Sequence, residues 1–527
     1  MTILGEMLIG SKSVRGVQGE QKAFNPALNQ EIDSPVFGFG DQHNVNEAAT
    51  LAQQALDIYR NTSLQKRAAF LESIAENILA LGDELIERAH QETGLPVARL
   101  QGERGRTVGQ LRLFAQVVRD GHFLNATIDL AQPERAPLPR ADLRLAKIPL
   151  GVVAVFGASN FPLAFSVAGG DTASALASGA PVIVKAHGAH LGTSELVGRA
   201  IQKAVQDHQL PEGVFSLLIG AGRSLGEALV AHPHVKAVGF TGSRQGGLAL
   251  VNIANARPEP IPVYAEMSST NPVFLFPNIL AENLENIAKG FADSLTMGAG
   301  QFCTNPGLVI VVEGHDCDNF IEVAAQALAA KAAQTMLTAG ICKAYQDGVS
   351  QVEQAANVHK VATGQAVGDM QNAAQAQLFV TTAEEFLANP DLHAEIFGPA
   401  SIVVKVKTVD EFQQVAEFIE GQLTITLHIN DADYAQAGKL LPILERKAGR
   451  ILMNAYPTGV EVCHAMVHGG PFPSTSNSMY TSVGASAIDR FLRPVCYQDM
   501  PDSLLPDALK ASNPFNLHRL VNGQFTE

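Results

Sequence analysis

A thiol, a carboxylate and an amide occur in three segments whose patterns suit chemistry at a carbonyl group. Cys303 lies in the uncharged stretch Gly300–Thr304, Glu266 ends a strand-like run, and Asn160 occupies a strand-to-helix turn. A thiol can attack a carbonyl carbon, an amide can donate to the resulting oxyanion, and a carboxylate can take a proton from water. The three residues together predict acyl chemistry with Cys303 as the nucleophile.

Each of these residues also has a structural interpretation. A cysteine is commonly a small buried hydrophobe, and Asn160 could only cap the helix expected to begin near Pro162. Glycine beside Cys303 permits a backbone that exposes the thiol. Glu266 precedes uncharged residues, and partial desolvation there would raise its pKa toward the range of a general base; its alternative is a solvated strand end. The other cysteines lack such surroundings: Cys317, Cys342, Cys463 and Cys496.

Composition narrows the class of protein. A length of 527 residues suggests about three domains. Only 17% of the residues are charged, which favours large buried sheets and interfaces. The net charge of −15 disfavours nucleic acid and anionic membrane surfaces, which require a basic footprint. The start lacks the pattern of a secretory signal, and five irregularly spaced cysteines indicate a reducing cytoplasm rather than a disulfide framework.

The middle of the chain has the regular alternation of strand and helix patterns that is typical of βαβ units. We expect a doubly wound parallel sheet that binds a nucleotide, because short β-branched runs alternate with helical patterns. The expected strands are 151–156, 181–185, 214–219, 235–240 and 261–265. The expected helices between them are about 162–178, 191–208, 223–231 and 244–255.

A second α/β block follows this one. Its expected strands are 272–276, 308–312, 401–406, 423–429 and 450–454, and its Ala/Gln-rich region 322–376 favours helix. The first 120 residues predict a hairpin and long helices at about 44–58, 63–91 and 95–120. An alternating run within 125–147 predicts a hairpin arm, and the turn-rich tail 479–527 would need a partner surface to be ordered.

These patterns predict three units. A nucleotide-binding domain comprises 1–124 and 148–267, a catalytic α/β domain comprises 268–478, and a β-arm with tail for oligomerisation comprises 125–147 and 479–527. The expected arm predicts that the protein forms a homo-oligomer. Both a dimer and a tetramer would use such an arm, so the sequence does not decide between them. No metal-ligand pattern is identified.

A glycine-rich loop, Gly239–Gly247, follows an expected strand and opens a helix. Glycines at such a place let a pyrophosphate approach the helix N-terminus, although many αβ connections share this composition. Lys185 ends another strand, where it could contact a ribose or phosphate or could be a surface lysine whose stem is buried.

Together these motifs resemble the aldehyde dehydrogenase superfamily over nearly the whole chain. The resemblance rests on Asn160-Phe161-Pro162, Phe240-Thr241-Gly242-Ser243, Glu266, Gly300-Gln301-Phe302-Cys303 and Glu395-Ile396-Phe397-Gly398-Pro399. It implies that Cys303 is the nucleophile and Glu266 the general base, with Asn160 and the Cys303 N–H forming the oxyanion hole. It further implies cofactor contacts by Lys185, Gly242, Ser243, Gly247, Glu395 and Phe397.

The sequence departs from the family pattern at two catalytic segments. Most members follow the glutamate with Leu-Gly-Gly, where this chain has Met267-Ser268-Ser269, and the usual Pro-Trp before the asparagine is Ala158-Ser159. A third departure concerns the cofactor. Gly188 replaces a glutamate that binds the ribose diol in many NAD-preferring members, and Arg223 could meet a 2′-phosphate or simply be solvated. We therefore expect NADP to be accepted and preferred over NAD.

The segments 185–187, 300–307 and 457–471 resemble one branch of the superfamily, which holds 2,5-dioxopentanoate dehydrogenases and a related NADP-dependent fatty aldehyde dehydrogenase. The resemblance implies oxidation of 2,5-dioxopentanoate to 2-oxoglutarate; a broad or long-chain aldehyde dehydrogenase is the alternative. His464 and His468 could line the substrate entrance or be structural. The candidates for binding a substrate carboxylate are Arg144, Arg490 and Arg493.

More distant functions are disfavoured. A CoA-acylating enzyme would not need Glu266 to drive hydrolysis. A cofactor-free thiol hydrolase would pair Cys303 with a histidine base, but the nucleotide-binding pattern argues against it. A structural protein on this fold would be expected to lose Cys303 or Glu266, and both are present.

Overall fold

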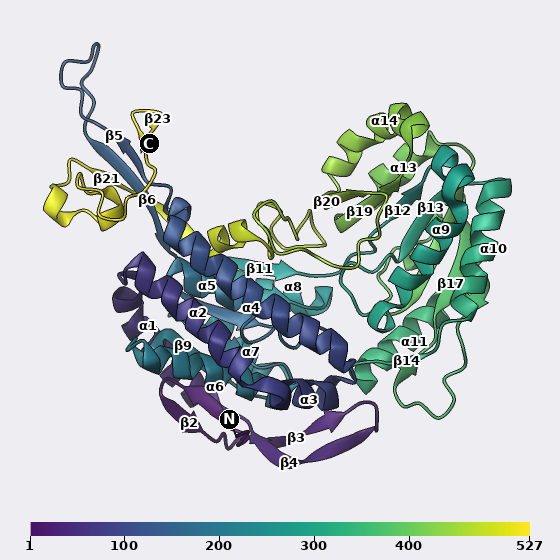
Figure 1. The fold of residues 1–527 in the computed structure, drawn as a ribbon, viewed down its shortest axis with the longest axis horizontal. Coiled ribbons are helices and arrows are strands. Elements are labelled where there is room, and N and C mark those ends of the chain that lie inside the picture. Colours follow the sequence, from purple (N-terminus) through teal and green to yellow (C-terminus); the bar gives the residue numbers. More distant parts are fainter. Residues whose placement is uncertain (1, 527) are drawn as a thin grey trace.

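The computed structural model describes residues 2–526 and contains two large α/β units and a projecting β-arm (Figure 1). The first unit is built on a seven-stranded sheet. Five neighbouring strands, counted from one edge of this sheet, run parallel: β11, β10, β7, β8 and β9. In sheet order its strands are β11 (Val263–Glu266), β10 (Val235–Thr241), β7 (Val152–Phe156), β8 (Val182–Lys185), β9 (Phe215–Leu218), β1 (Met7–Ile9) and β2 (Lys12–Val14).

This sheet is doubly wound, as the sequence predicts. The chain runs from β7 outward to β8 and β9, then returns to β10 and β11 on the other side of β7. The crevice of such a sheet opens at the carboxyl ends of the strands beside this reversal, between β7 and β10. Lys185 and Glu266 are the last residues of β8 and β11, so both lie at that edge.

Eight helices of the first unit pack around the sheet: α1 (Gln42–Arg60), α2 (Leu64–Ala80), α3 (Gly82–Thr93), α4 (Val97–Asp120), α5 (Gly170–Ser178), α6 (Leu191–Asp207), α7 (Ser224–Ala231) and α8 (Arg244–Asn255). The predicted helix 63–91 is wrong in its continuity, because Gly82 adopts a φ of 58° that an α-helix does not tolerate. The predicted helix 162–178 begins only at Gly170, since the preceding residues form turns.

The second unit has its own seven-stranded sheet. Its order is β15 (His359–Thr363), β17 (Gln377–Thr382), β18 (Ala400–Val406), β13 (Leu308–Val312), β12 (Val273–Leu275), β19 (Gln422–His428) and β20 (Ala448–Met453). Its helices are α9 (Pro277–Thr296), α10 (His315–Ala329), α11 (Ala339–Glu353), α12 (Ala383–Ala388), α13 (Glu411–Phe418) and α14 (Tyr434–Glu445).

The prediction that the Ala/Gln-rich region 322–376 favours helix is wrong in part. Helices α10 and α11 account for much of it, but β15 pairs antiparallel with β17 at the edge of the sheet. Two further strands, β14 (Gln334–Thr335) and β16 (Ala373–Ala374), pair with each other. Pairing with a neighbouring strand overrides the helix propensity of the composition here.

The arm is a five-stranded sheet that stands away from both α/β units (Figure 1). Its order is β21 (Leu492–Gln498), β6 (Leu143–Pro149), β5 (Thr127–Asp129), β22 (Leu520–Val521) and β23 (Gln524–Phe525). The expectation that the tail needs a partner surface is wrong: β22 pairs with β5 of the same chain. A separate hairpin, β3 (Glu20–Asn25) with β4 (Gln30–Gly38), lies along the first unit.

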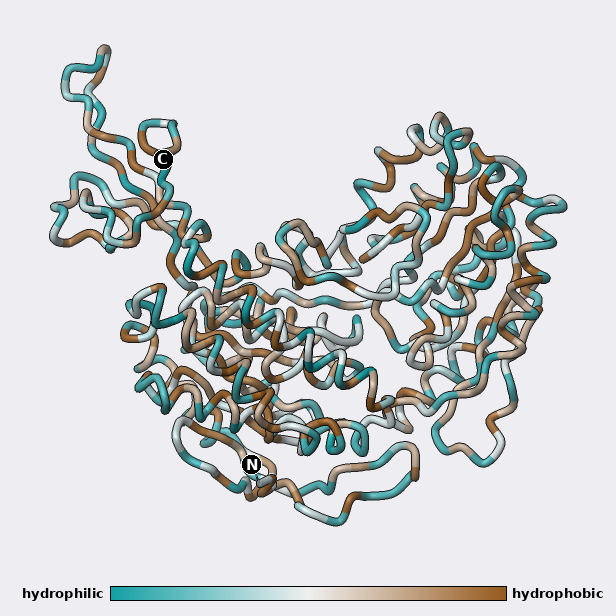
Figure 2. The backbone as a smooth tube through the Cα atoms, in the orientation of Figure 1, coloured by the Kyte–Doolittle hydropathy of each residue, from teal (hydrophilic) through white to brown (hydrophobic). Residues whose placement is uncertain are grey.

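Hydrophobic residues concentrate in the strands of the two large sheets, while the outer loops are mostly hydrophilic (Figure 2). Strand β7 is buried along Val152–Val155, and β19 is buried along its whole length, as expected for parallel strands covered on both faces. Within residues 2–526, no helix combines the length and apolar character that crossing a membrane requires.

The turn before Cys303 depends on glycine. Gly298, Ala299 and Gly300 have φ values of 57°, 57° and 64°, and a Cβ on Gly300 would lie 2.3 Å from the Gly398 carbonyl carbon. Because that neighbour is backbone, it cannot move aside as a side chain would.

We therefore expect Gly300→Ala to destabilise the fold by about 1–3 kcal/mol and to displace Cys303 enough to abolish aldehyde oxidation. Thermal unfolding and turnover measure the two effects. The matched control is Gly102→Ala in α4, where a Cβ would meet no atom within 4 Å; its stability should be unchanged or slightly higher. An unchanged melting temperature in Gly300→Ala would contradict the conclusion that the turn requires glycine at position 300.

Candidate active site

Cys303 is held through its own carbonyl. Asn271 adopts a left-handed φ of 49°, and its Nδ2 donates to the carbonyls of both Cys303 and Asn305 at 2.9 Å. Asn305 in turn donates from Nδ2 to the Gly398 carbonyl at 3.0 Å. One amide side chain thus fixes both sides of the turn that carries the thiol.

The segment between the two units is fixed by Gln422, the first residue of β19. Its Oε1 accepts from Ser269 Oγ at 2.9 Å, Thr270 N at 2.8 Å and Asn271 N at 3.0 Å. Ser269 also accepts from Leu423 N at 2.9 Å. Ser269 stands where most aldehyde dehydrogenases have glycine, so this departure supplies part of the clamp.

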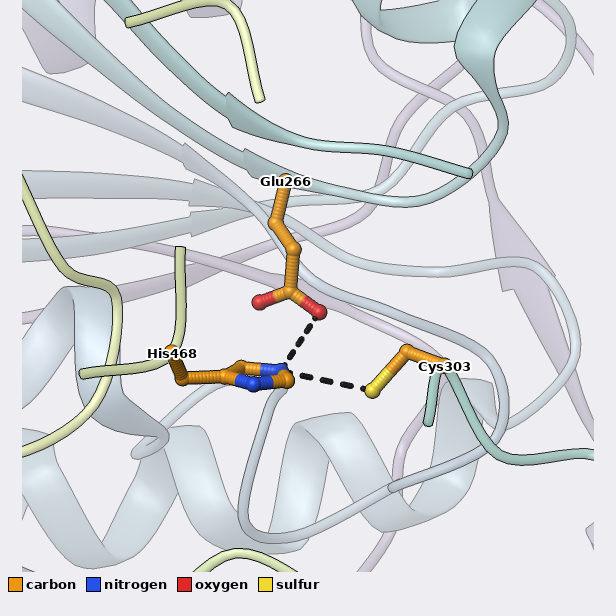
Figure 3. Close-up of side chains that lie close together, drawn as sticks. All are labelled: Glu266, Cys303 and His468. Atoms are coloured by element: carbon orange, nitrogen blue, oxygen red, sulfur yellow. Dashed lines mark hydrogen bonds and ion pairs between the residues drawn. The ribbon is translucent and has the colours of Figure 1, made fainter. Parts of the chain in front are cut away.

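The structure brings Glu266 and Cys303 together around His468 (Figure 3). His468 Nε2 lies 2.8 Å from Glu266 Oε1 and 3.3 Å from Cys303 Sγ. His468 and Glu266 are 1% and 2% exposed, so water does not screen the cluster. Ser482 Oγ donates to Glu266 Oε2 at 2.7 Å, which leaves the carboxylate with partners on both oxygens.

The expected raised pKa of Glu266 is wrong. Burial acts to raise the pKa of Glu266, but the attraction of His468 and hydrogen bonds from His468 and Ser482 outweigh it and hold the pKa below its usual value. The sequence pattern indicated the desolvation but could not indicate the partners. Glu266 is therefore ionised at neutral pH and able to accept a proton.

The ionised Glu266 carboxylate determines that Nε2 of His468 carries a hydrogen. A carboxylate only accepts hydrogen bonds, so Nε2 must carry the hydrogen that it shares between Glu266 and Cys303 Sγ. The other ring nitrogen, Nδ1, is buried without a protein partner. His468 therefore acts from one nitrogen as a donor to both groups, and Glu266 is the acceptor available for the thiol proton.

Burial raises the pKa of the Cys303 thiol well above its usual value, and the charge of Glu266 raises it further, while Arg106 opposes this effect. The thiol is thus protonated in the resting cluster. Attack on a carbonyl requires that this proton move to Glu266, with the His468 N–H stabilising the thiolate left behind.

Asn160 reaches the same turn from the first unit. Its Nδ2 donates to the Gln301 carbonyl at 3.0 Å, and its own carbonyl accepts from Arg99 Nη2 at 2.7 Å. An amide NH₂ carries two hydrogens, so one remains to meet an oxyanion beside Cys303. Arg99 also lies against the rings of Phe161 and Phe302, at 5.0 and 4.8 Å from their centroids.

All the predicted cofactor residues except Gly247 line two cavities. The first, of about 280 Å³, contains Lys185, Gly242, Ser243 and Arg223 together with His187. Ser243 caps α8 by accepting from Gly246 N, so the start of that helix faces the cavity. A helix N-terminus favours anions, and this arrangement fits the pyrophosphate and adenosine end of a dinucleotide.

The second cavity, of about 370 Å³, contains Glu395 and Phe397 with Gly300 and Phe302 from the cysteine turn. Burial raises the pKa of Glu395 to about 8. A polar group and aromatic rings beside the thiol suit the ribose and nicotinamide end of the same cofactor.

Gly247 does not line either cavity. A Cβ at this position would lie 2.7 Å from Met267 Sδ, so Gly247 serves the close packing of α8 against the residue after Glu266. This function is close to that of the third glycine in dinucleotide-binding loops, which permits helix–strand contact.

Of the three arginine candidates for a substrate carboxylate, only Arg490 lies near the cluster, where it lines a small cavity with Glu266 and His468. Arg144 belongs to the arm and donates to Asp142 Oδ1 and the Leu509 carbonyl. Arg490 is buried in an ion pair with Asp171 at 2.7 Å, and Arg493 is exposed on β21.

Of the two candidate histidines, only His468 joins the cluster; His464 is exposed on the preceding loop. The sequence placed His468 in a distinctive segment but could not give it a partner. Ser482, Asn271 and Gln422 were missed, because ordinary polar residues carry no local signal for contacts that are distant in sequence, from 32 residues for Asn271 with Cys303 to 216 residues for Ser482 with Glu266.

The ligand atoms of Glu266, Cys303 and His468 lie within 4.8 Å of one another, a set that could also hold a metal ion. A metal bound there would occupy the thiol and the carboxylate together, so acyl chemistry requires these atoms to be free.

The comparison with known families decides which family the chain belongs to. The model of the aldehyde dehydrogenase family matches residues 14–493. The chain belongs to the aldehyde dehydrogenase family. The chain is therefore an oxidoreductase rather than a cofactor-free thiol hydrolase, although His468 would have supplied the histidine that a hydrolase needs.

Two relatives are similar over almost their full length. Alpha-ketoglutaric semialdehyde dehydrogenase 2 of Azospirillum brasilense is 63% identical over 99% of this chain and 100% of that protein. Alpha-ketoglutaric semialdehyde dehydrogenase of Acinetobacter baylyi is 48% identical over 97% and 98%.

Among solved structures, aldehyde dehydrogenase C from Pseudomonas syringae, crystallised as a mutant with NAD+ and octanal, superposes with a TM-score of 0.80 at 19% identity, covering 95% of this chain and 98% of that one. PnpE in complex with nicotinamide adenine dinucleotide gives 0.79 at 20% identity, covering 94% and 97%. At these identities the likeness concerns the fold.

Substitution of Glu266 tests the electrostatics of the cluster. Because the Glu266 charge raises the pKa of Cys303, Glu266→Gln should lower that pKa and speed alkylation of Cys303 by iodoacetamide at pH 8, by about tenfold for each pKa unit. Turnover should fall, since the proton acceptor is lost. Alkylation rates from pH 6 to 10 measure the change.

Glu395→Gln is the matched control, because its charge raises the pKa of Cys303 less than Glu266 does; a smaller acceleration is expected. Slower alkylation of Glu266→Gln at every pH would mean that Glu266 assists ionisation of the resting thiol instead of opposing it.

Proposed function

We propose that this enzyme oxidises 2,5-dioxopentanoate to 2-oxoglutarate with NADP as its preferred cofactor. The observation that carries the proposal is the buried Cys303–Glu266–His468 cluster, in a chain 63% identical to an alpha-ketoglutaric semialdehyde dehydrogenase. The family chemistry requires NAD(P), and the two cavities at the carboxyl edge of the first sheet and beside the thiol suit it.

The reaction begins with the thiol. Glu266 accepts the proton of Cys303, and the thiolate attacks the aldehyde carbon to give a thiohemiacetal. The oxyanion receives hydrogen bonds from Asn160 Nδ2 and the Cys303 N–H, where preorganised donors stabilise developing charge. A nicotinamide held in the cavity of Glu395 and Phe397 would supply the hydride acceptor needed to turn the thiohemiacetal into a thioester.

Hydrolysis completes the reaction. Once Glu266 has released its proton to solvent, it takes a proton from water, which attacks the thioester carbon and expels the thiolate. His468 and Ser482 hold the carboxylate in place during this step. The products are the carboxylic acid and the free cysteine.

The substrate assignment is tested by comparing 2,5-dioxopentanoate with hexanal and a long-chain aldehyde. We expect kcat/KM at least tenfold higher for the dioxo acid, because its carboxylate adds binding energy that an alkyl chain lacks. Formation of reduced nicotinamide measures the rate, with Cys303→Ala as an inactive control that still binds NADP. Preference for the plain aldehydes would favour the long-chain alternative.

The NADP preference rests on the first cavity. Gly188 is exposed with open space around it, so no acidic side chain projects from this position toward a 2′-phosphate. Lys185, His187 and Arg223 line the cavity. Glu227, one turn after Arg223 on α7, lines it too and would repel a phosphate.

We expect Arg223→Ala to raise Kd for NADP about tenfold or more while changing Kd for NAD less than threefold, since an exposed charge pair contributes about 1 kcal/mol or somewhat more with a doubly charged phosphate. Fluorescence quenching measures both constants. Glu227→Gln is the matched variant and should tighten NADP. Equal losses for both cofactors in Arg223→Ala would refute the phosphate contact.

The division into 1–124 with 148–267, 268–478, and 125–147 with 479–527 follows the two sheets and the arm, and we propose it for the functional domains. We further propose that the projecting arm assembles a homo-oligomer, as dimer or tetramer, in the cytoplasm. Light scattering of the purified protein tests the assembly.

A further inference from the structure

We propose that Arg106 forms the carboxylate subsite of the active site and binds the end of the substrate remote from the aldehyde. This inference rests on the proposed function. In 2,5-dioxopentanoate the aldehyde and the carboxylate occupy opposite ends of a five-carbon chain, so the subsite must lie near Cys303 without touching the reacting carbon.

Contacts place Arg106 beside the cluster. Its guanidinium carbon lies 5.1 Å from the centroid of the Phe165 ring, and that ring lies 6.2 Å from the ring of His468, which contacts Cys303. Arg106 extends from α4, and Phe165 belongs to the turn after Asn160. The Phe165 ring therefore lies between the Arg106 guanidinium and His468, the residue that contacts the thiol.

The guanidinium has two free donors on one edge. Nε and Nη2 of Arg106 are buried and have no hydrogen-bond partner among residues 2–526. These two N–H groups are parallel, which is the arrangement that binds both oxygens of a carboxylate at once. Two buried donors without hydrogen-bond partners are costly, and a substrate carboxylate would remove that cost only when bound.

The other arginines near the site lack this arrangement. Arg450 donates from both Nη atoms to the carbonyls of Pro457 and Gly459 and so holds the loop before His468. Arg99 uses Nη2 on the Asn160 carbonyl, and its unpartnered atoms, Nε and Nη1, do not share an edge.

None of the carboxylates around Arg106 within residues 2–526 accepts a hydrogen bond from its Nε or Nη2. Glu103, one turn earlier on α4, accepts from Leu163 N and Ala164 N through Oε1, and Glu266 is held by His468 and Ser482. Glu461 is exposed on the loop above. Cys303 and all three carboxylates attract Arg106 electrostatically, yet its Nε and Nη2 form no hydrogen bond with the described residues.

The test measures kcat/KM of Arg106→Gln with three aldehydes of five carbons: 2,5-dioxopentanoate, 5-oxopentanoate and pentanal. Loss of a buried charge partner should lower kcat/KM roughly 100-fold for the two carboxylates, mainly through KM, and less than threefold for pentanal. Arg106→Lys should recover part of the loss, because it restores the charge but not the paired donors.

Inhibition by glutarate, a dicarboxylate without an aldehyde, gives a second readout that a purely structural role would not change. Its inhibition constant against pentanal should rise by a similar factor in Arg106→Gln. Arg112→Gln is the matched control, because Arg112 lies on the same helix in an exposed ion pair with Glu76.

Equal losses for pentanal and the carboxylates, or a lowered melting temperature with an unchanged ratio of kcat/KM values, would overturn the subsite and leave Arg106 as a stabilising neighbour of Glu103. Failure of the proposed function is distinguishable, since wild-type enzyme would then prefer pentanal to both carboxylates before any substitution is made.

Discussion

Glu266 and Cys303 come from different sheets, and their approach is the constraint on which the rest of the site depends. Glu266 ends β11 in the first unit, Cys303 precedes β13 in the second, and their reactive atoms lie within 4.8 Å. A small shift between the units would therefore misplace the two groups and lower the rate of reaction. The hydrogen bonds of Asn271 and Gln422 therefore fix the chain at residues 269–271, where it passes from the first sheet to the second.

The buried cluster balances opposing electrostatic effects. Burial would neutralise Glu266, but the hydrogen bonds from His468 and Ser482 keep it ionised, and its charge in turn keeps Cys303 protonated. A resting thiol is less exposed to alkylation and oxidation than a thiolate. Glu266 is already in place to accept the thiol proton that must move before Cys303 attacks. The same three side chains therefore keep the resting thiol protonated and provide the base that activates it.

Much of the fold was predictable because parallel strands leave strong local patterns. The five central strands of the first sheet and the loop at Ser243 follow from short β-branched runs and glycine placement. Cys303, Glu266 and Asn160 were identifiable from motifs. His468 could not be assigned a role, because its partners lie 165 and 202 residues away, and the reversed pKa of Glu266 follows from those same distant contacts.

The distribution of positive charge links the fold to its anionic ligands. The protein carries a net charge of −15, and surface cations such as Arg112 and Arg119 are paired with glutamates. Arg106 differs in keeping two buried donors without a protein partner. A negative exterior weakens non-specific binding of anions at long range, whereas a shielded guanidinium attracts a carboxylate strongly once it enters. Discrimination between a dioxo acid and a plain aldehyde can therefore arise from one unpaired side chain, provided that nothing in the protein neutralises it first.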